Sequence, residues 1–197
     1  VSLLSIAAIF FLVYAFINFG IIWRSVIIGA ITVAAIIGAS LLRRRALTAT
    51  AEGIAAFAVV LIYLDAYAIR ANDFFGTASA QVAVYWGIVL IAAAIGFWLW
   101  HRGSKLRLPS IVGFASFPVG VGVLVGGLTR DLEDGTSVYL VFASIALAGL
   151  IHRLAPGPTN PARTERTIVL GTTIVSLLVG LAACLAAFPD TEWAPTF

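Results

Sequence analysis

Two carboxylates, Glu52 and Asp65, lie inside an otherwise apolar stretch, AEGIAAFAVVLIYLDAYAIRAND, at residues 51–73. They are the only carboxylates of the chain that fall within a hydrophobic run. An ionisable side chain inside a membrane-spanning helix is costly and marks a candidate functional site, such as an ion pathway or a proton relay. The depth of each carboxylate in its helix decides how far this hypothesis applies.

Neither carboxylate lies at the centre of the predicted helix, residues 47–69, whose middle is near residue 58. At the helical rise per residue, Glu52 is about 9 Å from the middle and Asp65 about 10.5 Å from it, in opposite directions. Their separation along the chain also rotates them by about 140° around the helix axis. Glu52 and Asp65 therefore do not share a face, which excludes a catalytic pair or a single ion site.

Glu52 has a local explanation. It lies in the second turn of the helix, near the positive end of the helix dipole, and Arg43–Arg45 are close in the sequence. Both features stabilise a carboxylate. We expect Glu52 to be a structural group at the membrane interface.

Asp65 has no such explanation, because it lies near the negative end of the helix dipole. Arg70, five positions further on, has the wrong helical spacing for a direct pair. We expect its partner on another helix, and the candidates are Arg24, Arg130, Asn18 and the tyrosine hydroxyls. Two interpretations stay open: Asp65 is a structural packing group, or it lines a polar cavity and takes part in ion or proton movement.

The helix that carries these residues belongs to a membrane protein. Hydrophobic residues make up 61% of the chain, charged residues 11%, and the mean hydropathy is +1.07. Each apolar run is long enough to cross a hydrocarbon core of about 30 Å. Seven spans are predicted, at residues 2–23, 25–42, 47–69, 80–100, 109–128, 137–154 and 167–188. The spans must be helices, because isolated strands leave backbone groups unsatisfied in lipid.

The connections between the spans indicate their orientation. Basic residues gather in alternate connections, nine on one side against three on the other. The first set is Arg43, Arg44, Arg45, Arg102, Lys105, Arg107, Arg153, Arg163 and Arg166; the second is Arg24, Arg70 and Arg130. Because basic loops stay in the cytoplasm, the N-terminus is predicted to be cytoplasmic and the C-terminus outside. The net charge of +3 follows these loops and does not indicate nucleic-acid binding.

Small residues and one proline predict how the helices pack. Gly122 and Gly126 form a GxxxG pattern, which is typical of helix contacts in membranes. Pro118 removes a backbone donor and is expected to kink its helix near residues 114–118. Residues 1–197 are predicted to form a single transmembrane domain, in which residues 25–69, 80–128 and 137–188 resemble three hairpin repeats. Since the chain has no methionine, we expect it to be part of a longer protein.

The sequence favours no enzymatic chemistry. It contains no phosphate-binding, nucleophile-elbow, zinc-protease or dinucleotide motif. Two histidines and one cysteine do not make a zinc site, and the acidic turn with Asp131, Glu133 and Asp134 lacks the spacing of a calcium loop. We expect no catalytic residue, no cofactor and no metal.

The stretch LTATAEGIAAFAVVLIYLDAYAIR, residues 47–70, resembles a segment of large multi-pass membrane proteins of actinobacteria whose function is uncharacterised. The shared pattern is the TAE start, the apolar middle and the closing LDAYAxR. The resemblance implies that the chain belongs to a larger membrane protein, and it assigns no functional residue.

The sequence therefore predicts an all-α, polytopic helical bundle in the cell membrane. A structural or scaffold-like module of a larger protein is slightly favoured over a transporter of a small solute, an ion or protons with Asp65 in the pathway. The expected partners are the lipid bilayer and further transmembrane segments of the same or another chain. The candidate polar residues within the membrane are Asp65, Glu52 and Asn18.

Overall fold

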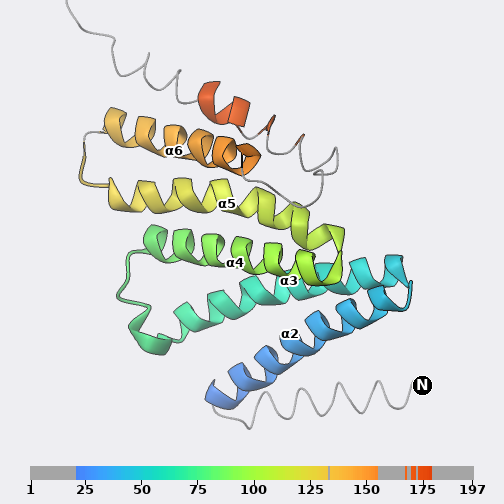
Figure 1. Ribbon diagram of the computed structural model, residues 1–197. Coiled ribbons are helices and arrows are strands. Elements are labelled where there is room, and N and C mark those ends of the chain that lie inside the picture. The colour runs from blue at the N-terminus through green and yellow to red at the C-terminus, as the bar shows by residue number, and fades with distance from the viewer. Residues whose placement is uncertain (1–20, 133, 155–166, 168–169, 172, 179–197) are drawn as a thin grey trace, which may run out of the picture. The chain divides into compact units, whose positions relative to one another are not determined.

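The computed structural model describes residues 21–132, 134–154, 167, 170–171 and 173–178, without the side chains of residues 21–24, 134–135 and 151–154. The regular elements in this part of the chain are all helical. In chain order they are α2 (Ile21–Arg44), α3 (Thr48–Ala71), the 3-10 helix η1 (Phe74–Gly76), α4 (Val82–Ser104), α5 (Arg107–Leu128) and α6 (Asp134–Leu154), as Figure 1 shows. The predicted all-α fold class is confirmed for the described residues.

Four of these helices are long and apolar enough to cross a membrane: Ser25–Arg44 within α2, and the whole of α3, α4 and α5. α6 contains a shorter apolar stretch, Thr136–Leu150. The second to sixth predicted spans fall on these five helices. Only residues 21–23 of the first predicted span are described, and they belong to α2, while most of the seventh span lies outside the described residues. The count of seven and the orientation of the termini therefore stay predictions.

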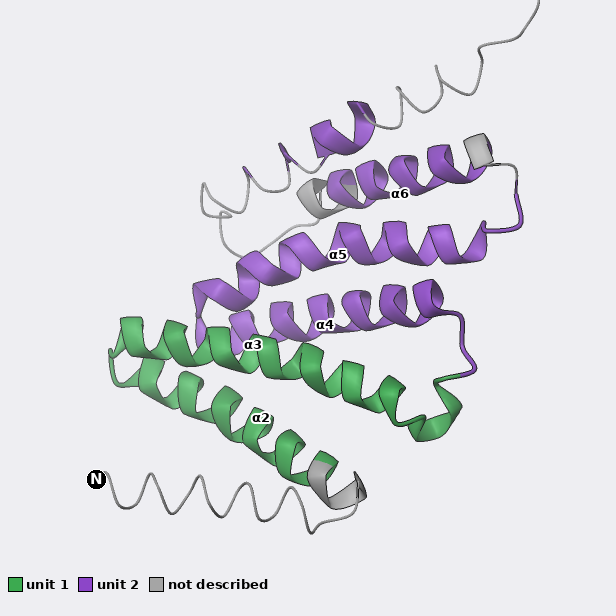
Figure 2. Cartoon of the chain, turned by 180° about the vertical axis from the view of Figure 1, so that it is seen from behind, with its two compact units in different colours: residues 1–78 green, residues 79–197 purple. Residues whose placement is uncertain are grey.

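The chain divides into two compact units, residues 1–78 and residues 79–197, which Figure 2 colours separately. In unit 1, α2 packs against the antiparallel α3; in unit 2, α5 packs against both α4 and α6. The hairpins α2–α3 and α4–α5 fall where the first two repeats were expected. The repeat itself and the single-domain organisation stay predictions.

Unit 1 has a seam of alanines on one face of α3. Ala51, Ala55 and Ala58 are fully buried, and their spacing of four and three residues places them on one side of the helix. Asp65 follows Ala58 by seven residues, two helical turns, and so continues this seam. The side chain of Asp65 therefore lies on the same packed face of α3 as these alanines.

In unit 2, glycines allow α5 to approach both of its neighbours. A Cβ atom built on Gly120 would lie 2.8 Å from Leu90 Cβ and 3.0 Å from the Ile91 backbone nitrogen of α4. A Cβ atom on Gly122 would clash with the Ile145 side chain of α6, and Gly126 also faces α6. The predicted GxxxG pair is confirmed as a helix contact. Because lipid supplies no hydrophobic drive between helices, this close packing is a main source of their association.

Pro118 is fully buried inside α5, which continues from Arg107 to Leu128 as one helix. Figures 1 and 2 both show α5 bending along its length. A proline inside a helix removes one hydrogen bond and tilts the preceding turn. The bend is consistent with the expected kink.

We predict that Gly120→Ala lowers the free energy of unfolding by about 1–3 kcal/mol, because the new methyl group has to push α4 and α5 apart. The matched control is Gly96→Ala on α4, where an added Cβ meets nothing within 4 Å. That control should be neutral or stabilising by up to about 1 kcal/mol, since alanine favours the helix. Unfolding of the purified protein in mixed micelles measures both, and equal effects of the two variants would contradict the packing argument.

Candidate functional site

Asp65 is held by a hydrogen bond between the two helices of unit 1. Thr32 Oγ1 of α2 donates to Asp65 Oδ2 of α3 across 2.7 Å. Thr32 is only 5% exposed, and Asp65 is half-buried. Asp65 lies six residues from Ala71, the end of α3, which is about 9 Å along the axis. The carboxylate is thus well inside the helix and has a hydroxyl donor from the facing helix.

The Thr32 hydroxyl lies near two acceptors but carries one proton. Its oxygen is 2.7 Å from Asp65 Oδ2 and 3.1 Å from the carbonyl oxygen of Ile28, one turn earlier in α2. The Ile28 carbonyl already accepts a backbone bond within the helix, so a charged Asp65 is the stronger acceptor for the hydroxyl proton. The hydroxyl therefore bonds across the hairpin, from α2 to α3.

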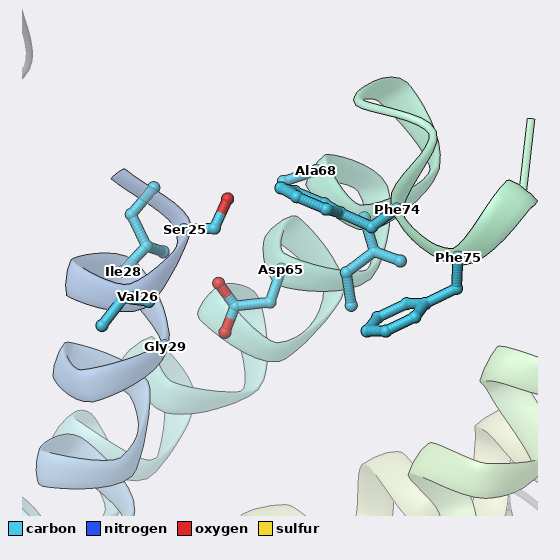
Figure 3. Close-up of a pocket in the computed structure, with 9 residues that line it drawn as sticks. Ser25, Val26, Ile28, Gly29, Asp65, Ala68, Phe74 and Phe75 are labelled. Carbon is cyan, nitrogen blue, oxygen red and sulfur yellow. The ribbon is translucent and has the colours of Figure 1, made fainter. Parts of the chain in front are cut away.

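Asp65 also lines a pocket with a volume of about 400 Å³. The pocket lies between α2, α3 and the turn that follows α3, so it belongs to unit 1 alone. Its lining residues are Ser25, Val26, Ile28, Gly29, Asp65, Ala68, Ile69, Phe74 and Phe75. Figure 3 shows the Asp65 carboxylate turned toward α2, with the Phe74 and Phe75 side chains extending from the turn. Among these described residues, Asp65 is the only ionisable one and Ser25 the only other with a polar side chain.

The turn after α3 is organised by its own hydrogen bonds. Arg70 Nη1 donates to the Thr77 carbonyl oxygen across 2.9 Å, and the Thr77 hydroxyl donates to the Ile69 carbonyl oxygen. Asp73 Oδ1 accepts from the Ala78 backbone amide across 2.7 Å. These bonds fix the segment that carries Phe74 and Phe75. Arg70 is thus engaged in the turn, in line with its poor spacing for pairing with Asp65.

Of the predicted site residues, only Asp65 is among the described residues that line this pocket. Glu52 is half-buried in the second turn of α3, off the alanine seam, and it does not line the pocket. The predicted separation of the two carboxylates on different faces is therefore confirmed. Asn18 and the Arg24 side chain lie outside the described residues, and Arg130 belongs to unit 2.

Sequence reasoning missed Thr32, because it looked for charged or phenolic partners of Asp65. A signal was present: Thr32 and the fully buried Ala39 lie seven residues apart on one face of α2, as Ala58 and Asp65 do on α3. Thr32 lies 12 residues before the end of α2, whereas Asp65 lies 17 residues after the start of α3. Side chains lean toward the N-terminus of their helix, so in an antiparallel pair these two lean toward each other and bridge the offset.

We predict that Thr32→Val lowers the free energy of unfolding by about 0.5–2 kcal/mol, because the isosteric valine leaves Asp65 without its hydroxyl donor. Thr32→Ser keeps the hydroxyl and should recover most of this loss. Both variants are compared with the unchanged protein by unfolding in mixed micelles. A valine variant as stable as the serine variant would show that the bond between α2 and α3 contributes nothing.

Comparisons of the chain with protein-family models, with curated proteins and with solved structures find no match. The resemblance of residues 47–70 to actinobacterial membrane proteins therefore stays a prediction. The geometry of Asp65, Thr32 and the pocket is the feature of the described residues that bears on function.

Proposed function

We propose that this chain is a solute-transport module of a multi-pass protein of the cell membrane, with Asp65 as the binding residue in the pathway. The proposed topology has seven spans, a cytoplasmic N-terminus and an outer C-terminus. In it, the pocket near the C-terminal end of α3 opens toward the outer side. The module would be part of a larger protein, as the resemblance of residues 47–70 implies, and it needs no enzymatic chemistry, cofactor or metal.

The observation that supports this proposal is the pocket at Asp65. A purely structural carboxylate would be sealed by its neighbours, because an ionisable group within the membrane is costly. A transport residue has to be reached by its solute. Asp65 lines a pocket of about 400 Å³, a size within the range of small-molecule sites. This distinction favours transport, although the sequence alone slightly favoured a structural module.

The hydrogen bond from Thr32 is compatible with solute binding. A carboxylate has two oxygens and accepts several hydrogen bonds at once. Thr32 holds Oδ2 and thereby fixes the direction of the side chain, while the carboxylate retains capacity for a solute in the pocket. A rigid first contact of this kind reduces the entropy lost on binding.

A structural role is the second candidate, and the same hydrogen bond favours it. Thr32 and Asp65 join α2 to α3 deep in the hairpin, and such bonds between membrane helices contribute about 0.6–2 kcal/mol. A scaffold module would use this bond to fix the hairpin and would have no use for the negative charge. A single substitution of Asp65 can remove its charge while it keeps the hydrogen bond with Thr32.

Asp65→Asn removes the charge but keeps an oxygen that accepts from Thr32. Transport predicts that this variant loses most of its flux while its melting temperature stays close to that of the unchanged protein. Flux is measured with the full-length protein in liposomes, using proton flux, sodium uptake and uptake of a panel of small organic solutes. Unchanged flux of every solute combined with a lower melting temperature would reject transport in favour of the scaffold.

The proposed orientation is tested with single cysteines in a Cys184→Ala background. Ala78→Cys lies in the turn after α3, and Lys105→Cys lies in the turn between α4 and α5. We expect a membrane-impermeant maleimide to label Ala78→Cys in intact cells and Lys105→Cys only after permeabilisation, because the basic turn is retained in the cytoplasm. The reverse labelling pattern would overturn the orientation.

A further inference from the structure

The geometry points to an organic ammonium ion with a small apolar body as the ligand of the Asp65 pocket. This inference rests on the proposed function, because it names the substrate class of the same site. Three features carry it: the charge of the pocket, its aromatic wall and the open space beside Gly29. The first two select against anions, neutral ligands and bare metal ions, and the third leaves room for an apolar body.

The charge of the pocket selects a cation. Asp65 is the only ionisable group among its described lining residues, and apolar side chains form most of the remaining wall. An anion would be repelled by the carboxylate, and a neutral ligand would leave it without a counter-charge. An ammonium group supplies both the positive charge and N–H donors.

The aromatic wall selects an organic cation over a bare metal ion. Phe74 and Phe75 line the pocket, and the face of a phenylalanine ring attracts ammonium groups. A metal ion such as calcium needs six to eight oxygen ligands, whereas among the described lining residues only Asp65 and Ser25 have side-chain oxygens. The rings and aliphatic side chains instead match an apolar body attached to the ammonium group.

The position of Phe75 is set by the backbone of the turn and not by packing of its side chain. It is 96% exposed, and its backbone has a φ of 62°, a left-handed conformation that a bulky residue rarely adopts. The hydrogen bonds of Arg70, Asp73 and Thr77 fix the turn on either side of it. Strained residues of this kind cluster at ligand sites, where the surrounding structure maintains them. The turn therefore presents an aromatic ring to the pocket before a ligand arrives.

Gly29 leaves space for the apolar body. It lines the pocket from α2, and a Cβ atom built on it would meet nothing within 4 Å. Gly38, on the same helix, also has nothing within 4 Å but does not line the pocket. A large side chain at Gly29 would fill the pocket, and the same substitution at Gly38 serves as the matched control.

The test uses three compounds of nearly equal size: 2-phenylethylammonium, 2-phenylacetamide and phenylacetate. Binding to the full-length protein is measured by calorimetry in phosphatidylcholine nanodiscs. We expect the ammonium compound to bind at least tenfold more tightly than the amide and the carboxylate not to bind. Equal binding of the three compounds would overturn the inference, because partition into the bilayer alone would explain it.

Three variants and one control variant test the features separately. Asp65→Asn should weaken ammonium binding at least tenfold and abolish the preference over the amide. Gly29→Leu should abolish binding, whereas Gly38→Leu should leave it unchanged. Phe75→Gly, which removes the ring and suits the positive φ, should weaken binding several-fold without lowering the melting temperature. Undiminished binding in Asp65→Asn or in Gly29→Leu would place the ligand elsewhere and overturn the inference.

The ammonium group can come from a soluble amine or from a lipid headgroup. Nanodiscs with added phosphatidylethanolamine separate these sources, because a lipid occupant weakens 2-phenylethylammonium binding in the unchanged protein and a soluble occupant does not. The outcome is also separable from that of the transport proposal. Loss of flux in Asp65→Asn without ammonium binding would reject only the ligand class. Ammonium binding without any flux would reject only transport.

Discussion

The absence of water from the hydrocarbon core is the constraint on which this structure depends. Every backbone polar group has to find its partner within the protein, and the helix satisfies most of them locally. The same constraint applies to the Asp65 side chain, which accepts a hydrogen bond from Thr32 of the facing helix. The helical fold of α2 and α3 and the hydrogen bond between Thr32 and Asp65 thus follow from a single physical requirement.

The two units meet the second requirement of membrane proteins, close packing, in different ways. In unit 2, Gly120 and Gly122 bring α5 against α4 and α6 so closely that an added methyl group has no space. In unit 1, Gly29 and Gly38 face open space, and the buried seam of α3 is made of alanines. Unit 2 is therefore densely packed through glycine contacts, whereas unit 1 retains a pocket beside its polar contact.

Much of the fold was predictable from hydropathy alone. The second to sixth predicted spans fall on observed helices, since runs of apolar residues of this length have few alternatives in lipid. The face relation of Glu52 and Asp65 was also predictable, because helical periodicity fixes it. The partner of Asp65 was not predicted, because threonine is an ordinary residue in membrane helices and carries no charge that would mark it.

By itself, the sequence determined the helices, their short connections and the depth of Asp65, because each of these depends on residues close together in the chain. The tertiary structure decided what Asp65 faces. The site combines residues from three segments. These are Thr32 and Gly29 on α2, Asp65 on α3 and Phe75 in the turn after α3. They form one site only after α2 and α3 have packed, since packing sets the distances between residues that no local pattern relates.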